Sequence, residues 1–262
     1  MEPDAFYLPL GQGRFESTRA TAGPWSPDMQ HGGPPAALLA HVLSAHEPVP
    51  GTRAGRIAVD VLGPIPVGPV TVTAVTVRPG RRIQLVAAEM TAGGRAVARA
   101  AMWRLAELAV PPPLMAGTPG PESAPDLPDR REWRLTFPGA YAEGYLAATE
   151  GRPVHASPGE ATVWLRQKIP LVAGTEPSPL ERILVVGDSG SGISAALDPT
   201  RYLFLNVDLV VTVHRDAEGE WVCLRSRTVI GDTGTGLVDT TLFDRSGAVG
   251  HATQTLLVTP RT

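Results

Sequence analysis

The chain has 262 residues and a 43% hydrophobic content, enough for one large domain or two small ones with an apolar core. Its net charge of −3 and pI near 6.1 give no electrostatic sign of nucleic acid or an anionic membrane as a partner. The single cysteine, Cys223, excludes an internal disulfide and a cysteine-rich metal site, and we expect no cofactor. We read no signal peptide and no apolar run of membrane-spanning length, so we expect a cytoplasmic protein.

The first half begins with a glycine-rich turn, Gly32-Gly33, that leads into an apolar segment. Pro34 and Pro35 suit the first positions of a helix, because the N–H groups there have no partner within the helix. Residues 36–43 therefore predict a helix. Apolar and β-branched patterns broken by glycine turns then predict strands at residues 59–61, 70–77, 82–90 and 95–105.

A proline-rich stretch divides the chain nearly in half. Residues 110–128 read VPPPLMAGTPGPESAPDLP. So many prolines fix φ and remove backbone donors, so neither a helix nor a central strand fits, and we expect a solvated linker. The predicted division is an N-terminal unit at residues 1–107, a linker at 108–129 and a C-terminal unit at 130–262.

The second half follows the same order of elements. A glycine-rich turn at residues 187–192 precedes a short apolar segment at 193–197, which we predict to be a helix. Predicted strands follow at residues 207–209, 220–230, 236–243 and 249–258. Two copies of one plan indicate duplication. A helix laid across an antiparallel sheet covers its apolar face, which is an α+β arrangement.

Short motifs recur in a fixed order along both halves. They include His31-Gly32-Gly33, Val77-Arg78-Pro79-Gly80-Arg81, Phe204-Leu205-Asn206-Val207-Asp208-Leu209, His214-Arg215, Glu220-Trp221-Val222, Gly234-Thr235-Gly236 and Gln254-Thr255-Leu256. Together they resemble acyl-CoA thioesterases of the thioesterase II type over nearly the whole chain except the linker. The resemblance implies a double hotdog fold, with two tandem hotdog repeats that each wrap an antiparallel sheet around a central helix. It also implies hydrolysis of acyl-CoA thioesters, an activity of fatty acid metabolism.

The resemblance also implies a site in which side chains hold a water molecule. By position these are Asp208, Thr228 and Gln254. An ionised carboxylate can orient water and accept its proton, while the hydroxyl and the amide fix the direction of attack. The backbone amides of Gly32 and Gly33, at a helix N-terminus, would bind the developing oxyanion.

Two further residues compete for roles in this site. His31 precedes the glycine pair and is a candidate for contact with the thioester or for general acid catalysis. Asp60 is the duplicate of Asp208, but its strand leads directly into Gly63-Pro64, and the family precedent favours the second half. We therefore prefer Asp208 as the base.

Other functions of the same fold stay open at this point. One is a hotdog hydratase or dehydratase acting on acyl-CoA, and another is a non-catalytic protein that binds acyl groups. The expected partner is a thioester carried by CoA or by an acyl carrier, and exposed sheet edges would allow a homo-oligomer. The sequence does not specify the acyl group.

Overall fold

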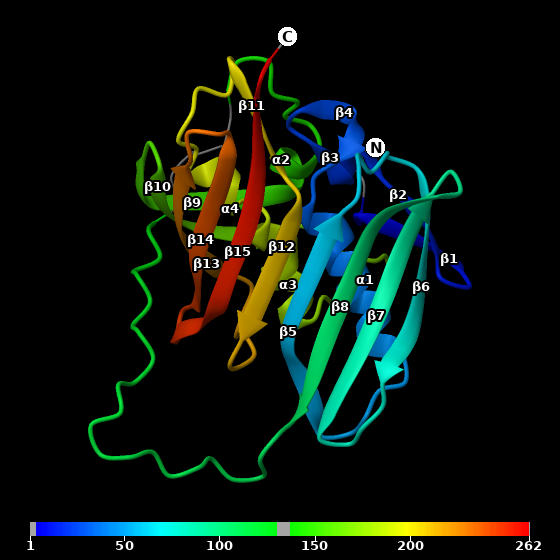
Figure 1. Ribbon diagram of the computed structural model, residues 1–262, viewed down its shortest axis with the longest axis vertical. Helices are drawn as coiled ribbons and strands as arrows, with labels where there is room; N and C mark the ends of the chain where they lie inside the picture. The colour runs from blue at the N-terminus through cyan, green and yellow to red at the C-terminus, as the bar shows by residue number, and fades with distance from the viewer. Residues whose placement is uncertain (1–3, 130–136, 262) are drawn as a thin grey trace.

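The computed structural model of the protein describes residues 4–129 and 137–261 (Figure 1). The predicted start of the second unit, residue 130, lies outside the described residues. In the described part of the chain, thirteen strands form one continuous antiparallel sheet. Its strand order is β1-β2-β6-β7-β8-β5-β12-β15-β14-β13-β10-β9, with β11 paired to β15; β3 (Ala22–Gly23) and β4 (Ser26–Gln30) form a separate pair.

The first half contributes one side of this sheet and the long helix α1 (Gly33–Ala45). Its strands are β1 (Tyr7–Gly11), β2 (Arg14–Ser17), β5 (Thr52–Val61), β6 (Pro69–Arg78), β7 (Ile83–Ala92) and β8 (Arg95–Ala106). Alternate residues of β7 are buried, including Val86, Ala88 and Met90, because one face of the sheet packs against α1. Gly93 and Gly94 both have positive φ in the hairpin between β7 and β8, which explains the glycine pair.

The second half contributes the remaining strands of the sheet, and its main helical segment is divided into two helices, α3 and α4. Its strands are β9 (Thr149–Ser157), β10 (Glu160–Gln167), β11 (Tyr202–Asn206), β12 (Asp208–Val213), β13 (Val222–Ile230), β14 (Thr235–Asp244) and β15 (Gly247–Pro260). Its helices are α2 (Tyr145–Ala148), α3 (Pro179–Gly187) and α4 (Gly190–Ile193). The helix predicted at residues 193–197 is therefore wrong: the main helix, α3, comes before the glycines. It starts at a capping box, in which Ser178 and Glu181 each bind the other's backbone N–H.

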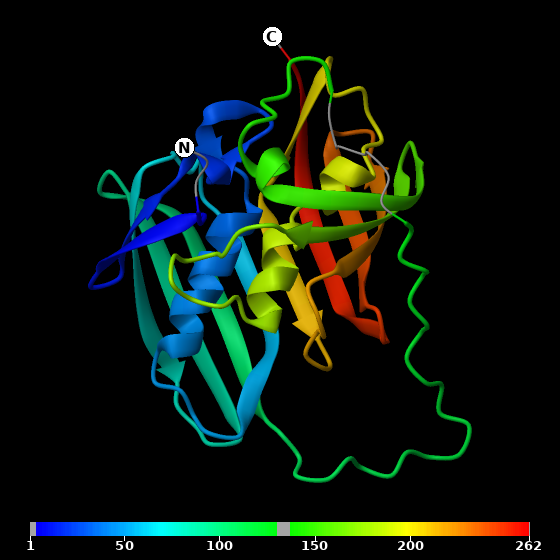
Figure 2. The same cartoon turned by 180° about the vertical axis from the view of Figure 1, so that it is seen from behind.

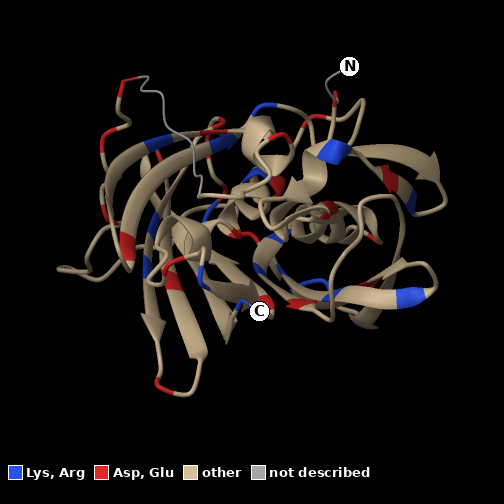
Figure 3. Cartoon of the chain, turned by 90° about the horizontal axis from the view of Figure 1, so that it is seen from above, with Lys and Arg blue, Asp and Glu red and all other residues tan. Residues whose placement is uncertain are grey.

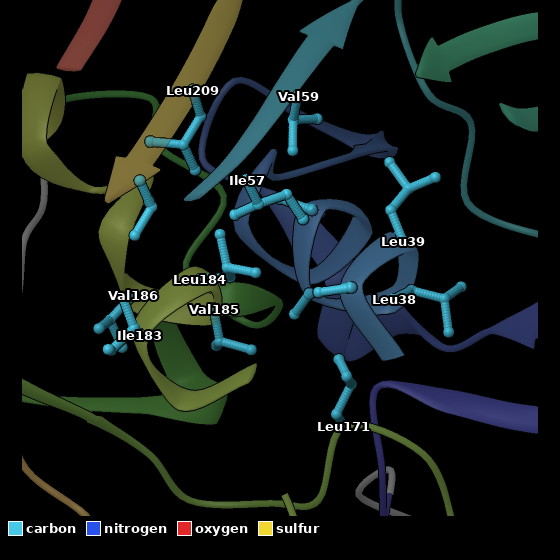
Figure 4. Packing of buried hydrophobic residues seen from close by; sticks show 14 of the residues in the cluster. Leu38, Leu39, Ile57, Val59, Leu171, Ile183, Leu184, Val185, Val186 and Leu209 are labelled. Carbon is cyan, nitrogen blue, oxygen red and sulfur yellow. The ribbon is translucent and has the colours of Figure 1, made fainter. Parts of the chain in front are cut away.

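The two halves meet along the sheet and along the helices. β5 pairs with β12, with Asp60 directly opposite Asp208. On the inner face, α1 and α3 lie side by side (Figure 2). Apolar side chains from both halves, such as Leu38, Leu184 and Leu209, pack into one core around these helices (Figure 4). Two helix-on-sheet repeats in one sheet are the double hotdog arrangement expected from the sequence.

The proline-rich segment is exposed in its first part and packed against the protein in its second part. Residues 108–120 run away from the body of the protein (Figure 1), and Leu114 and Met115 are 71% and 85% exposed. The following residues pack against the second half. Glu122 pairs with Arg225 at 2.5 Å, and Ala124 and Leu127 cover a cluster made of Trp164, Cys223 and Phe243. The first half of the segment is therefore the solvated linker that the sequence predicts, whereas the second half packs against the body of the protein.

Charged residues of both signs are interspersed along the chain (Figure 3). Among the described residues, no helix has the length and apolar composition needed to cross a membrane.

Candidate functional site

The site is centred on Asp188, the residue at which α3 ends. Its carboxylate is nearly buried, with 8% of the side chain exposed, and side chains from other elements converge on it. Asn206 donates from Nδ2 to Oδ1 at 2.7 Å, and Gln254 donates from Nε2 to the same oxygen at 3.2 Å. His31 places Nδ1 3.3 Å from Oδ2. One carboxylate thus joins residues that lie far apart in the sequence.

Gln254 is held in a single orientation. It is 1% exposed on the inner face of β15, and its Nε2 also donates to the Asp188 carbonyl at 3.1 Å. Its Oε1 accepts the Ser191 N–H at 3.2 Å. Because the amide donates to one side of the α3–α4 turn and accepts from the other, it fixes both the turn and the carboxylate.

Asn206 supplies a second amide from the end of β11. While its Nδ2 binds Asp188, its Oδ1 is buried and has no hydrogen-bond partner among the described residues. Buried polar atoms normally have a partner, and a free acceptor beside a carboxylate is suited to bind a hydrogen of a small molecule.

The N-terminal end of α1 closes the other side of the carboxylate. A Cβ on Gly32 would lie 2.7 Å from Asp188 Oδ2, so only glycine allows this approach. Pro34 and Pro35 have no N–H, and Ala36 N–H binds the Gly32 carbonyl, so the glycines supply the amide donors at this end. The Gly33 N–H points at His31 Nδ1, 3.2 Å away.

His31 lies between a carboxylate and an aromatic ring. Its imidazole stacks on Tyr145, with ring centroids 3.7 Å apart and an interplanar angle of 2°. Burial lowers the pKa of His31 from its ordinary 6.5, and the nearby charge of Asp188 opposes that shift. The imidazole is therefore neutral over most of the physiological range. If Nδ1 carries the ring proton, it donates to Asp188; if Nε2 carries it, Nδ1 accepts the Gly33 N–H.

The residues predicted from the sequence divide into two groups. The structure brings Gln254, His31, Gly32 and Gly33 to the Asp188 carboxylate. It does not bring Asp208 there.

Asp208 and Thr228 lie elsewhere. Leu209 is buried on the inner face of β12, so Asp208 faces the outer side, where its carboxylate accepts the Thr255 N–H at 2.6 Å. Gln254 is the neighbour of Thr255 on β15 and faces inward, opposite to Asp208. Thr228 is buried on the inner face, but its hydroxyl pairs with Ser194 Oγ at 2.7 Å rather than with the carboxylate.

Sequence reasoning missed Asp188, Asn206 and Tyr145. Asp188 fell inside the glycine-rich segment predicted as a turn, and the capping box at Ser178 is the signal that would have placed it at a helix end. Asn206 was noted only as part of a motif. Among the described residues, no group of three or more His, Cys, Asp or Glu side chains is arranged to hold a metal ion.

Two family models together match most of the chain. A family model described as the acyl-CoA thioesterase C-terminal domain matches residues 121–258, and one described as the acyl-CoA thioesterase N-terminal domain matches residues 21–105. The chain belongs to the acyl-CoA thioesterase family. This protein is accordingly a thioesterase, an enzyme that hydrolyses thioesters. A comparison with curated protein sequences found no match.

Solved structures share the fold of this acyl-CoA thioesterase family member. A candidate thioesterase II from Thermobifida fusca is 17% identical with a TM-score of 0.73, and the match covers 97% of this chain and 95% of that one. A hotdog protein of unknown function from Alicyclobacillus acidocaldarius gives 17% and 0.73, covering 99% and 98%. The acyl-CoA thioesterase II TesB2 from Mycobacterium marinum gives 13% and 0.68, covering 98% and 95%. At these identities the likeness establishes the double hotdog fold.

Proposed function

We propose that this thioesterase hydrolyses acyl-CoA with a water molecule that Asp188 activates. The observation that carries the proposal is the convergence of Asn206 and Gln254 on one buried carboxylate. Both amides bind Oδ1, so Oδ2 remains the oxygen that can accept a proton from water. The aspartate expected from the sequence thus keeps its role, but we assign that role to Asp188 in place of Asp208.

The water molecule would lie between two acceptors. It would donate one hydrogen to Asp188 Oδ2 and the other to Asn206 Oδ1, the buried oxygen with no partner among the described residues. Both hydrogens would then be held, and a lone pair of the water oxygen would face the thioester carbonyl. Transfer of one proton to Asp188 as the C–O bond forms is general base catalysis, which contributes about 10²–10⁴-fold to rate.

The start of α1 is suited to bind the oxyanion of the tetrahedral intermediate. When His31 Nδ1 carries a proton, it donates to Asp188 and releases the Gly33 N–H for the substrate oxygen. The α1 dipole adds positive potential at the same place. Collapse of the intermediate breaks the C–S bond, the thiolate takes the proton from Asp188, and the products are the acid and CoA thiol.

The test is a pair of aspartate substitutions assayed for thiol release on a panel of acyl-CoA chain lengths. Asp188→Asn keeps the shape of the side chain but removes the base, so kcat should fall about 10²–10⁴-fold with little change in KM. Asp208→Asn is the matched control, because its carboxylate lies on the opposite face of the sheet, and it should keep nearly full activity. Gln254→Ala should give an intermediate loss.

The opposite pattern would refute the assignment. An active Asp188→Asn together with an inactive Asp208→Asn would return the site to the outer face of the sheet. The same assay with acyl-carrier-protein thioesters in place of acyl-CoA tells which carrier presents the acyl group.

A further inference from the structure

Tyr145 touches both sides of the proposed site without facing the reacting atoms. Its ring is parallel to His31 at 3.7 Å, and its hydroxyl lies 3.0 Å from the Val185 carbonyl and 2.8 Å from Ser189 Oγ. Val185 and Ser189 bracket Asp188 at the end of α3. One side chain therefore contacts the imidazole and also the turn that carries the carboxylate.

The hydrogen bonds of Tyr145 define the direction of each proton. A carbonyl can only accept, so the Tyr145 hydroxyl donates to Val185, and the Ser189 hydroxyl then donates to Tyr145. Burial raises the pKa of Tyr145, and the side chain is 2% exposed, so the phenol stays a neutral donor. Both hydrogen bonds are thus buried, and the phenol keeps the proton that it donates to Val185 at neutral pH.

The position of Tyr145 is set by contacts of α2 and its flanking residues with both halves. A Cβ on the preceding Gly144 would lie 2.3 Å from the Ala22 carbonyl, so glycine is needed for α2 to approach this closely. The Tyr141 N–H donates to the Pro24 carbonyl at 2.9 Å, and the Lys168 N–H donates to the Ala148 carbonyl at 2.8 Å. Bonds on both sides of the short helix hold Tyr145 in place.

We infer that Tyr145 is a positioning residue that fixes the plane of His31 and the turn carrying Asp188 in one arrangement. This inference rests on the proposed function of Asp188. The torsion that rotates an imidazole about its Cβ–Cγ bond is soft, so His31 needs a neighbour to hold Nδ1 toward Gly33 and Asp188. A parallel aromatic ring provides that restraint. Displacement of catalytic groups by about 1 Å can cost about 10²-fold in rate.

Two substitutions separate the ring from the hydroxyl. Tyr145→Phe keeps the stacked ring and loses the bonds to Val185 and Ser189, so we expect kcat to fall about 10-fold with KM nearly unchanged. Tyr145→Ala loses both, and kcat should fall about 10²-fold or more. Tyr202→Phe is the matched control, because Tyr202 is half-buried on β11 and makes no side-chain hydrogen bond to the described residues; it should behave as wild type.

The titration of His31, followed by NMR of the imidazole, is independent of turnover. Among the described residues, the titratable groups that face His31 are Asp188 and Tyr145. Tyr145→Ala admits water beside the ring, so the pKa of His31 should rise toward 6.5, whereas Tyr145→Phe should leave it low.

Each outcome bears on the inference. Loss of kcat in Tyr145→Ala with an unchanged His31 titration would overturn it and leave only a structural role. Wild-type kcat in Tyr145→Phe would overturn the part assigned to the hydroxyl, and this variant decides the matter should the alanine variant fail to fold. An active Asp188→Asn would refute the proposed function instead, while the His31 titration would still report whether Tyr145 holds the ring.

Discussion

The packing of Gly33 against the backbone of α3 predicts a large effect for a one-carbon substitution, Gly33→Ala. The added Cβ would lie 2.0 Å from the Val185 carbonyl oxygen and 3.2 Å from the Leu184 oxygen, where contacts normally exceed 3.4 Å. Both atoms are backbone atoms of α3, so no side chain can rotate away. The helices would have to separate by about 1 Å, and overpacking of this kind costs about 3 kcal/mol.

Chemical denaturation monitored by circular dichroism measures this cost. We expect the midpoint to fall with an unchanged slope, and the melting temperature to drop by about 6–12 °C. Activity should fall as well, because Gly33 lies beside His31 and Asp188. Gly63→Ala is the control, since a Cβ there meets nothing within 4 Å, and it should change stability by less than about 0.5 kcal/mol. A Gly33→Ala protein that unfolds at the wild-type midpoint would refute the argument from close packing.

Three further predictions concern stability. Because burial holds the pKa of His31 below 6.5, the unfolded chain binds its proton first, so the free energy of unfolding should decrease as pH falls from 6.5 toward the folded pKa, and His31→Asn should flatten this curve in denaturation at several pH values. Asp244 is fully buried and binds Arg215 through both oxygens, so Asp244→Asn should cost about 2–3 kcal/mol by denaturant titration, and a smaller change than about 0.5 kcal/mol would contradict the pairing. Arg104 is 4% exposed and donates to the Leu43 and His46 carbonyls at the end of α1, so Arg104→Lys should lower the melting temperature by several degrees, about 2 kcal/mol in free energy.

The strands of the first half were predictable because their pattern is local. Residues 70–77, 82–90 and 95–105 were expected as strands; the first and third lie within β6 and β8, and the second matches β7 except that β7 begins one residue later, at Ile83. Alternating apolar residues and glycine turns carry this information in the sequence itself. The duplicated order of elements indicated two copies of one α+β plan, and the family resemblance implied that this plan is the double hotdog.

The site was predictable only in part. Gln254 and the His31–Gly33 segment were identified, but the base was sought between Asp60 and Asp208, and Asp188 was not among the candidates. The apolar residues Leu209, Val211 and Val213 alternate along β12 and would have placed Asp208 on the outer face, so this signal was present but not used.

The direction in which Asn206 faces could not be predicted from the sequence. It pairs with Leu256 on β15, whereas Val210 pairs with Thr253, so the ladder slips by one residue between β11 and β12. After this slip Asn206 and Leu209 face the same side although they are three positions apart. A bulge of this kind depends on the neighbouring strand, and the period of the sequence alone gives no sign of it.

The ladder between β5 and β12 joins the two halves non-covalently, in addition to the covalent connection between them. A protease that cut within residues 108–120, the exposed stretch, would leave two fragments joined by backbone pairing, by the α1–α3 contact and by a shared core. Expressed as separate chains, the fragments would meet by the same contacts. The N-terminal fragment contains His31 and the glycines, and the C-terminal fragment contains Asp188, Asn206 and Gln254. The thioesterase activity of the mixture would therefore measure how much of the protein has reassembled.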